Sequence, residues 1–245
     1  MTAATNEHGQ RIGRAVDWSP RSVPGRDVLE GQGVRLEPLT TDHADDLFAA
    51  LCREDDDPLW TYLFWERPRT RDELVALVEA MSAAPATVPI AIVARETGAA
   101  VGFCSLMRID AVMGSLEIGG IAFGRQLQRS RAATEAMYVL MRHAFDDLGY
   151  RRYEWKCDSL NAPSRRAAIR LGFIWEGRFR NAVVHKGRNR DTDWFSVTDL
   201  EWPRVKKALE DWLDDRNFDV AGRQRVRLAA RPVEQPSHRS TPREQ

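Results

Sequence analysis

Hydrophobic residues recur along much of this chain with the two-residue period of β-strands. Residues 34–39 (VRLEPL) show this alternation, and the apolar runs 88–95 and 100–109 flank Glu96-Thr97-Gly98, which is typical of a hairpin turn. Further strands are predicted at residues 115–123, 151–157, 173–185 and 194–200, the last two around a polar hairpin at 186–191. The pair Gly119-Gly120 interrupts one of these strands and indicates a bulge or a close approach to the backbone.

Other stretches carry apolar residues at the three- and four-residue spacing of amphipathic helices. These predicted helices cover residues 40–54, 70–81, 133–148, 161–171 and 201–216. The clearest is 133–148, which ends at Gly149, and the next begins at Asn161 as its cap and ends at Gly172. Residues 55–68 follow neither period, although they hold the aromatic run PLWTYLFW, which could cover a substrate or belong to the core.

The order of these elements predicts the fold class. Hairpins next to strand–helix–strand crossovers indicate a mixed sheet with helices on its faces, an α/β or α+β domain. We expect this domain to span residues 34–221, with residues 1–33 packed on it as an N-terminal extension. Residues 222–245 contain six Arg and two Glu but no Phe, Trp, Tyr or Ile. Such a segment buries too little apolar area to offset its ordering entropy, so we expect an Arg-rich mobile tail.

Composition limits the class of protein further. The 245 residues include 36 Lys plus Arg and 36 Asp plus Glu, so no global attraction to nucleic acid or acidic membranes is implied. No apolar run approaches the roughly 20 residues that span a bilayer, and the N-terminus lacks a signal-like segment. Cys52, Cys104 and Cys157 are too widely spaced for a disulfide scaffold or a thiolate zinc site. We therefore expect a cytoplasmic protein with no membrane partner and no metal.

The strongest functional feature is the polar loop at residues 124–131, which leads into the helix at 133–148. The first turn of a helix presents unpaired N–H groups and a partial positive charge, which suit a phosphate. Arg125, Arg129 and Arg131 strengthen this preference for an anion. The alternative is a solvated loop, because every helix has an N-terminus.

Several segments, in order and at matching spacing, resemble the GNAT acyltransferase superfamily, in particular its branch of RimJ/RimL-like ribosomal-protein N-acetyltransferases. They are LEIGGIAF, QRSRAATEA, HAFDDLGY, RRYEWKCD and NAPSRRAAIRLGF, and the similarity runs from about residue 33 to 216. The resemblance implies a GNAT fold in which the strands at 115–123 and 151–157 run parallel and splay apart near Gly119-Gly120. It also implies acetyl-CoA as co-substrate.

The resemblance carries over to a cofactor-binding set. The superfamily's pyrophosphate loop, Gln/Arg-x-x-Gly-x-Gly/Ala, falls on Gln128, Arg129, Ser130, Arg131, Ala132 and Ala133. Arg131 stands where Gly is usual, which costs free energy only if its φ is positive. The pantetheine arm is expected along the backbone of Ile121, Ala122 and Phe123, and Asn161 is expected to hydrogen-bond it.

Two catalytic residues follow from the same resemblance. Glu117, where the branch carries an acidic residue, is the expected base, and the alternation of Leu116 and Ile118 places it on the opposite face from them. Ser164 takes the place of the tyrosine that many members use near the CoA sulfur, because Ala168 stands at that position. The competing interpretations are an exposed strand glutamate paired with Arg or Lys, and a serine that only supports its helix.

We therefore expect an N-acetyltransferase that transfers acetyl directly to a primary amine, either a protein N-terminus or a small molecule. An alternative is a GNAT-fold binding or regulatory protein that holds CoA without turnover, which Arg131 and the missing tyrosine favour. Nucleic acid as the main target is disfavoured by the zero net charge, although the Arg-rich stretch 165–190 and the tail leave ribosome association open. The acceptor and a homodimer stay open as well, because fold alone does not choose among acceptors.

Overall fold

The structure, a computed structural model, describes residues 4–230. Its strands are β1 (Ala4–Thr5), β2 (Arg11–Ile12), β3 (Leu29–Glu30), β4 (Val34–Pro38), β5 (Val88–Ala94), β6 (Ala100–Asp110), β7 (Ser115–Phe123), β8 (Arg152–Asp158), β9 (Ile174–His185) and β10 (Arg188–Thr198). Its α-helices are α1 (Ala44–Leu51), α2 (Asp57–Trp60), α3 (Arg71–Ala83), α4 (Arg131–Arg142), α5 (Ala162–Arg170) and α6 (Trp202–Leu213). Short turns of other helix types are η1 (Thr41–His43), η2 (His143–Asp147) and η3 (Asp215–Asn217).

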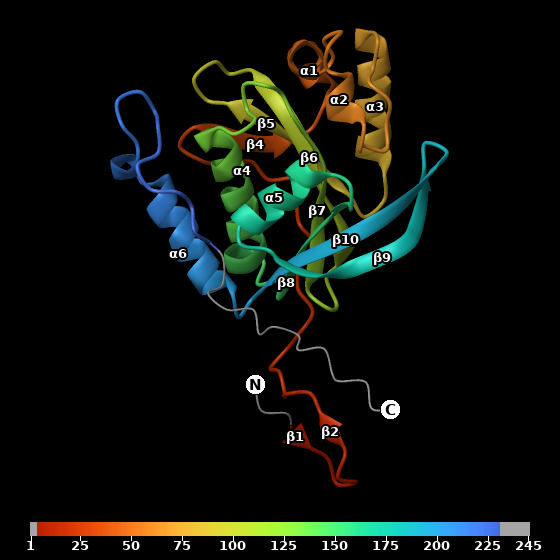
Figure 1. The fold of residues 1–245 in the computed structure, drawn as a ribbon, viewed down its shortest axis with the longest axis vertical. Helices are drawn as coiled ribbons and strands as arrows, with labels where there is room; N and C mark the ends of the chain where they lie inside the picture. Colours follow the sequence, from red (N-terminus) through yellow and green to blue (C-terminus); the bar gives the residue numbers. More distant parts are fainter. Residues whose placement is uncertain (1–3, 231–245) are drawn as a thin grey trace, which may run out of the picture.

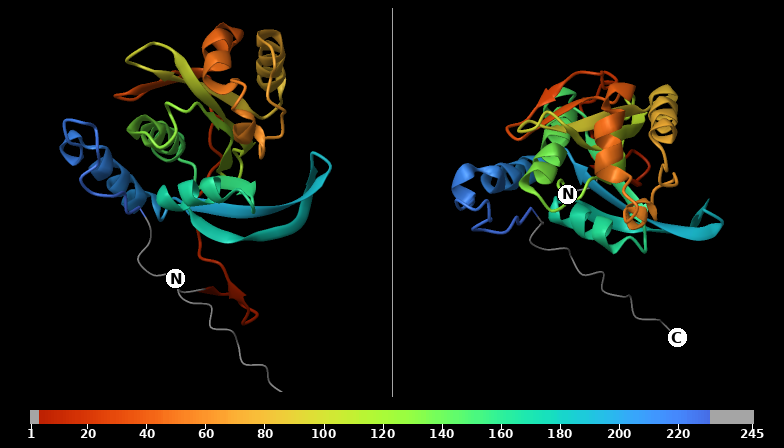
Figure 2. Two further views of the ribbon diagram at one scale, coloured as in Figure 1. Left: turned by 45° about the horizontal axis from the view of Figure 1, so that its top comes forward. Right: turned by 90° about the horizontal axis from the view of Figure 1, so that it is seen from above.

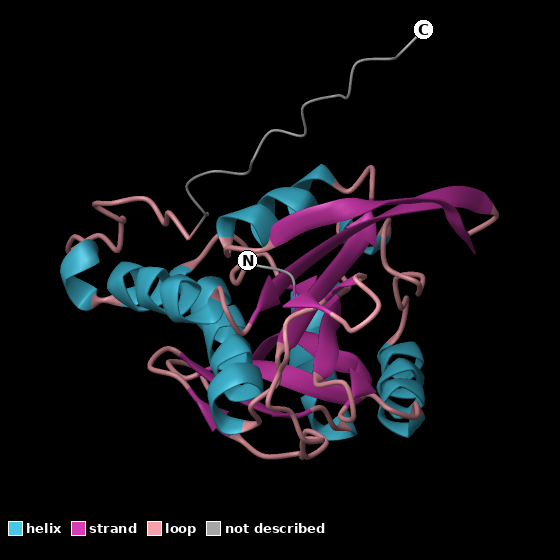
Figure 3. Ribbon diagram, turned by 90° about the horizontal axis from the view of Figure 1, so that it is seen from below, coloured by secondary structure: helices cyan, strands magenta, loops and turns pink. Residues whose placement is uncertain are grey.

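Eight strands form one mixed sheet in the order β3-β4-β5-β6-β7-β8-β10-β9. Only β7 and β8 pair in parallel, and every other neighbouring pair in this sheet is antiparallel. Helices α1 to α3 cover one face of the sheet, and α4 to α6 cover the other (Figure 1; Figure 3 shows helices flanking the strands on both sides). The prediction of a mixed α/β sheet with helices on its faces is confirmed.

Alternation along the strands divides the core into two clusters. On β7, Leu116 and Ile118 point into the larger cluster under α4, whereas Ala122 belongs to the smaller cluster under α1 and α3. Glu117 lies between Leu116 and Ile118 and therefore faces the α1–α3 side, as the alternation predicted. The two faces of β7 thus pack against different clusters, and the bulge in this strand affects the packing on both faces.

The hairpin between β9 and β10 is longer than predicted. The strands continue to a two-residue turn at Lys186-Gly187, where φ is +49° and +70°, so β10 begins at Arg188 rather than near residue 194. Two positive φ angles match the twist of a tight hairpin. The prediction was wrong because this end of the hairpin projects past the helices and needs no apolar alternation (Figure 2).

Helix boundaries shift by a few residues. The helix predicted at 40–54 is the turn η1 followed by α1, and the one predicted to Arg216 ends at Leu213. The long central helix loses its regular α form at His143, where five residues take the wider π geometry. The sequence pattern does not predict this change from α to π geometry, because the apolar stripe continues through Ala144 and Phe145.

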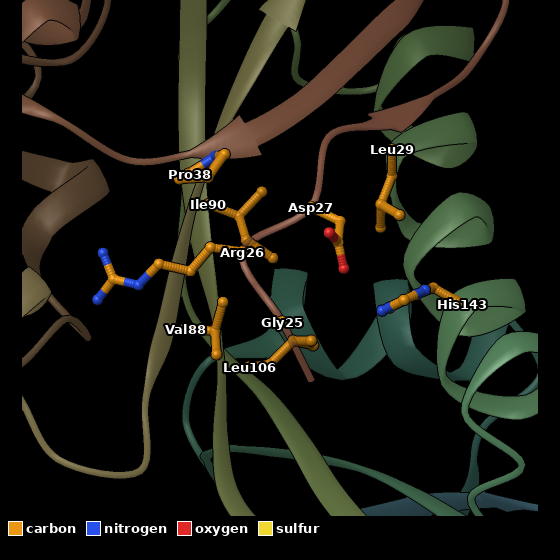
Figure 4. A pocket seen from close by; sticks show the side chains of 9 residues that line it. All are labelled: Gly25, Arg26, Asp27, Leu29, Pro38, Val88, Ile90, Leu106 and His143. Carbon is orange, nitrogen blue, oxygen red and sulfur yellow. The ribbon is translucent and has the colours of Figure 1, made fainter. Parts of the chain in front are cut away.

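The N-terminal extension follows the surface of the domain after the projecting β1–β2 hairpin (Figure 1). Trp18 donates its indole N–H to the carbonyl of Val112, and Tyr150 donates its hydroxyl to the carbonyl of Ser22. Gly25, Arg26, Asp27 and Leu29 then line a small cavity beside β4 to β6, where the side chains of Asp27 and His143 lie next to each other (Figure 4). None of the expected site residues lines this cavity.

The boundary predicted after residue 221 falls within a packed segment. Gln224 accepts a hydrogen bond from the indole of Trp212, and the backbone of Val226 exchanges hydrogen bonds with the side chain of Asn217. Ala230 is buried against Gly172. These contacts tie residues 222–230 to α6, η3 and Gly172, although most of their side chains are exposed, and the mobility of the tail stays a prediction. The remainder of the predicted tail, 231–245, lies outside the described residues.

Glu135 joins the extension to the central helix. Its side chain is buried in α4, and its two carboxylate oxygens accept hydrogen bonds from the N–H groups of Gln32 and Gly33, the latter at 2.8 Å. The carboxylate also lies close to Gly31 and Gly33, where a Cβ would come within 3.0–3.1 Å of it. Glu135 therefore sets the turn that leads the chain into β4.

Replacing Glu135 with alanine should lower the free energy of unfolding by about 2 kcal/mol, because two backbone donors lose their acceptor. Urea unfolding of the variant and the wild type measures the difference. Glu79→Ala, an exposed change on α3, is the matched control and should cost less than about 0.5 kcal/mol. Equal effects of the two changes would contradict the anchoring role of Glu135.

Candidate active site

The parallel ladder between β7 and β8 is short. It pairs Ser115 with Arg152 and ends where Ile118 pairs with Trp155. Beyond that point β7 continues beside β6 to Phe123, and β8 continues beside β10 to Asp158. The two strands therefore diverge and leave a wedge in the middle of the sheet, on the C-terminal side of Ile118 and Trp155.

A bulge on β7 accompanies this divergence. Gly120 and Ile121 together lie opposite Cys104 of β6, between the pairs Gly119–Ser105 and Ala122–Phe103. Gly120 has φ of +58°, which disfavours a residue with a Cβ, and a Cβ there would lie 3.4 Å from the ring of Trp65. The bulge predicted at Gly119-Gly120 is thus present. Gly120 is the residue of this pair whose positive φ favours glycine.

The start of α4 lies on the chain segment that follows β7. Ser130 is the N-cap, and its hydroxyl accepts from the N–H of Ala133 at 3.0 Å. The N–H groups of Arg131 and Ala132 have no partner within residues 4–230. Two free amides at the positive end of a twelve-residue helix suit an anion.

The three arginines of this loop are not equivalent. The guanidinium of Arg125 forms ion pairs with Asp55 and Asp56 at 2.6 and 2.9 Å. The guanidinium of Arg131 binds Asp215 and the carbonyl of Leu213 and lies over the ring of Phe218, so it is directed away from its own helix start. Arg129 alone is exposed with no ion pair to a described carboxylate.

Arg131 does not carry the backbone strain that its position suggested. It is the first residue of α4, and the positive φ of the loop, +59°, falls on Arg129 instead. An arginine at the usual glycine position is therefore free of backbone strain here. Strained positive φ angles often occur where a loop is shaped for a ligand.

The backbone expected to hold the pantetheine arm, at Ile121, Ala122 and Phe123, borders the wedge and pairs with β6 on its other side. Gln128 donates its side-chain amide to the carbonyl of Phe123 at 2.8 Å, so this residue closes the loop onto the strand. The wedge and the loop thus form one continuous edge, which runs from β7 into α4.

Glu117 is buried on the α1–α3 side of the sheet, one residue before the ladder ends. Lys156 of β8 lies 2.8 Å from its Oε2, and the more exposed Arg108 lies 3.2 Å from the same oxygen. Burial raises the pKa of Glu117, and the hydrogen bond and charge of Lys156 oppose this rise. The interpretation as an exposed glutamate is wrong, although its predicted pairing with a cation is present.

Lys156 connects two carboxylates. It also lies 2.7 Å from Glu154, and its ammonium is 3.7 Å from the centre of the Trp194 ring. Burial acts to raise the pKa of Glu154, but hydrogen bonds from Lys156 and Arg152 hold it below its usual value. Of the two carboxyls that share this lysine, Glu117 is the one whose pKa is shifted toward the range of a general base.

Ser164 and Asn161 lie on the other side of the wedge, at the start of α5. The indole of Trp155, the last β8 residue in the ladder, donates to the Ser164 hydroxyl at 2.9 Å. That hydroxyl also contacts Cys157, where burial raises the pKa of the thiol to about 11. Asn161 caps α5 through its carbonyl oxygen, and its NH₂ group makes no hydrogen bond within the described residues.

An aromatic segment covers the Glu117 side. Trp60 is core, whereas Phe64 is exposed and contacts His185 edge-on. Lys186, at the tip of the β9–β10 hairpin, donates to the carbonyls of Trp60 and Trp65 at 2.9 and 3.1 Å. The hairpin and the aromatic segment together enclose the face on which Glu117 lies.

Sequence reasoning missed Lys156, Glu154, Trp194 and Arg190 on this face. The register of the parallel pair places Glu117 beside Glu154, so the even-numbered positions of β8 face the same side as Glu117. The alternation of Tyr153, Trp155 and Cys157 indicates that Glu154 and Lys156 share the opposite face of β8. Placing that face beside Glu117 also requires the register of two strands that are far apart in sequence.

A mixed sheet that splays at its parallel pair, next to the start of a helix with free amides, defines an acyl-CoA transferase of the GNAT class. Comparisons with known proteins agree. The family described as "Acetyltransferase (GNAT) domain" matches residues 34–174. The chain is 28% identical over 181 residues to the uncharacterized N-acetyltransferase p20 of Bacillus licheniformis, covering 72% of this chain and 98% of that protein.

Solved structures extend this similarity. A GCN5-related N-acetyltransferase from Brucella melitensis superposes with a TM-score of 0.85 at 48% identity, covering 86% of this chain and 96% of that one. A Bacillus subtilis protein provisionally named a ribosomal N-acetyltransferase, YdaF, is 29% identical over 109 residues, 44% of this chain and 59% of its own length. This chain belongs to the GNAT acetyltransferase family and is an N-acetyltransferase.

Two further searches concern residues 4–230. No helix in this part of the chain is long and apolar enough to cross a membrane. No three His, Cys, Asp or Glu side chains among the same residues are grouped so that they could hold a metal ion.

Lys156→Met should lower the free energy of unfolding at pH 7 by about 3 kcal/mol, because it leaves two buried carboxylates without their shared cation. The loss should shrink as the pH falls through the raised pKa of Glu117 toward 4.5, since the native carboxyls then bind protons before the unfolded ones do. Urea unfolding between pH 8 and 4 tests this. Arg108→Gln, at an exposed and longer pair, is the control and should cost under about 1 kcal/mol. A loss that is independent of pH would exclude this origin.

Proposed function

We propose that this protein transfers the acetyl group of acetyl-CoA directly to a primary amine in the wedge between β7 and β8. The observation that carries the proposal is the end of the β7–β8 ladder at Ile118 and Trp155, next to the free amides of α4. An extended pantetheine arm would lie along Ile121, Ala122 and Phe123, and the pyrophosphate would lie at Arg129 to Ala133. Relatives named as N-acetyltransferases support this chemistry.

The residues around the wedge fit acetyl-CoA. The backbone N–H groups of Arg131 and Ala132 and the NH₂ group of Asn161 have no hydrogen-bond acceptor among residues 4–230. Arg129 adds an exposed positive charge to the same loop. Gly119 and Gly120 have no side chains, so a pantetheine arm could approach the backbone of the bulge closely.

Glu117 has the properties of the base. The attacking amine must be neutral, and at pH 7 roughly one α-amine in ten is neutral against one lysine side chain in about 2,500. Glu117 takes the proton of the ammonium, the nitrogen attacks the thioester carbonyl, and the C–S bond breaks as the C–N bond forms. Of the two protons that the ammonium loses, one finally goes to the CoA sulfur and one to solvent.

Ser164 fits the role of a hydrogen-bond donor to the departing sulfur. Its oxygen accepts from the indole of Trp155, which orients the hydroxyl so that its proton is free to be donated.

The alternative, a protein that holds CoA without turnover, loses its main support. It rested on Arg131 at the glycine position and on the missing tyrosine, and Arg131 has an ordinary helical backbone, so only the missing tyrosine still favours it. Calorimetry with acetyl-CoA, followed by single-turnover assays on a panel of amines and peptide N-termini, separates the two functions. Absence of acetyl-CoA binding would contradict both, and binding without transfer to any amine would support the alternative.

Arg129→Gln should weaken acetyl-CoA binding about fivefold, because an exposed charge near the diphosphate is lost. The effect should decrease at high salt, since exposed charges are screened. Arg14→Gln removes the same charge from the exposed N-terminal extension and should leave the dissociation constant unchanged. Isothermal titration calorimetry at two salt concentrations measures both variants, and equal weakening in the two would place the diphosphate elsewhere.

Glu117→Gln should lower kcat about tenfold for an α-amine acceptor and about 100-fold or more for a lysine-type acceptor, which is harder to deprotonate. The difference should narrow as the pH approaches the pKa of the lysine. Glu154→Gln, which keeps the Glu117–Lys156 pair, is the matched control. Equal small effects on the two acceptor types would dismiss Glu117 as the base.

A further inference from the structure

Arg190 of β10 is a buried cation that forms no ion pair within residues 4–230. The residue is 7% exposed, and its Nε is buried with no hydrogen-bond partner. Its guanidinium lies over the ring of Phe64, 4.7 Å from the ring centre, and forms no ion pair with a carboxylate within residues 4–230. A desolvated charge in this state is costly, so proteins rarely keep one without a use for it.

The neighbouring arginines show the contrast. Arg178 binds Asp193 through two hydrogen bonds of 2.7 and 3.1 Å, and Arg165 lies 2.8 Å from the same carboxylate. Arg190 differs from these two arginines because it is enclosed and forms no ion pair with a carboxylate within residues 4–230.

Arg190 lies on the face of the sheet that holds Glu117. Phe64, on which it stacks, belongs to the aromatic segment of that face. Burial lowers the pKa of Arg190, whereas the charge of Asp158 at the end of β8, then Cys157, and then Glu117 oppose this shift. In the strand register, Thr192 pairs with Asp158 at the end of β8, so Arg190, two residues before Thr192, lies just beyond the C-terminal end of β8.

Two more buried hydroxyls on this face have no hydrogen-bond partner within residues 4–230. Thr192 lies two residues after Arg190 on β10 and pairs in register with Asp158 of β8. Ser105 lies on β6 opposite Gly119, at the bulge. These groups lie on β6 and β10, the outer neighbours of the two strands that form the wedge, and they indicate that a polar ligand completes their hydrogen bonds.

We propose that Arg190 binds a carboxylate of the acceptor, so that the substrate is a primary amine that also carries a carboxylate. The proposal rests on the acetyltransferase function proposed above. The planar guanidinium matches a carboxylate through two parallel hydrogen bonds. A single guanidinium balances a monoanion, whereas a dianionic phosphate would leave excess negative charge beside Asp158 and Glu117.

The same arrangement accounts for both ends of such an acceptor. Glu117 on β7 faces the ammonium, and Arg190 on β10 faces the carboxylate across the wedge. The carboxylate can come from a free amino acid or from an acidic residue near the N-terminus of a peptide. Both sources share the chemistry that Arg190 recognises.

Matched acceptors test the proposal and separate the two sources. One set compares free α-amino acids with their α-carboxamides, and the other compares peptides with Asp or Glu at the first two positions with their Asn or Gln counterparts. The wild type should favour the carboxylate at least tenfold in kcat/KM within one set. If the wild type acetylates amines but neither set shows a preference, the proposal fails while the acetyltransferase function stands.

Arg190→Gln should abolish that preference by raising KM for the carboxylate acceptor at least tenfold, with little change for its amide. Arg188→Gln, an exposed arginine two residues earlier on the same strand, is the control and should keep the preference. An equal loss of kcat for both acceptors in Arg190→Gln would instead assign the guanidinium to the reacting carbonyl and overturn the proposal.

A measurement without turnover completes the test. Arg190→Met, which fills the same space without the charge, should raise the melting temperature of the ligand-free protein by a few degrees. N-acetylglycine, which has a carboxylate but no free amine, should raise the melting temperature of the wild type and not that of Arg190→Met, and N-acetylglycinamide should raise neither. A lower melting temperature for Arg190→Met, or equal responses to both compounds, would overturn the proposal even if no acceptor amine is found.

Discussion

The early end of the β7–β8 ladder is the constraint on which the site depends. Strands in a sheet normally keep their partners, because an unpaired backbone group inside a protein costs free energy. Here β8 remains paired with β10, and β7 remains paired with β6 across a bulge, so each strand keeps one partner and gives up the other. The opening therefore leaves backbone groups available in the middle of a sheet whose two faces are covered by helices. An extended ligand can form hydrogen bonds with these backbone groups, as an additional strand would.

The second constraint is electrostatic. The face that holds Glu117 buries carboxylates and cations together, and Lys156 serves two of those carboxylates while it stacks on Trp194. This arrangement keeps Glu117 ionisable but raises its pKa, which is the condition that a base for an ammonium group requires. Arg190 is buried and forms no ion pair within residues 4–230, and locally unfavourable arrangements of this kind are typical of binding sites.

Departures from the family's usual sequence have physical explanations in the structure. Arg131 replaces the usual glycine without backbone strain, since the positive φ has moved to Arg129, and its side chain binds the end of α6 and η3 instead of the loop. The hydroxyl of Ser164, the proposed replacement for the usual tyrosine, accepts a hydrogen bond from the indole of Trp155.

The sequence alone determined most strands and helices of the domain, the bulge at Gly119-Gly120 and the face on which Glu117 lies, because these depend on the local two- and 3.6-residue periods. It also carried enough of the family's segments to indicate the fold. It did not determine which cations contact Glu117, the length of the β9–β10 hairpin, or that Arg190 forms no ion pair within residues 4–230. From the sequence, Lys156 is an ordinary strand residue and Arg190 belongs to a polar hairpin, and only the register of β7, β8 and β10 brings positions 117, 156 and 190 to one face. Pairings of that kind depend on the whole sheet, and no local period records them.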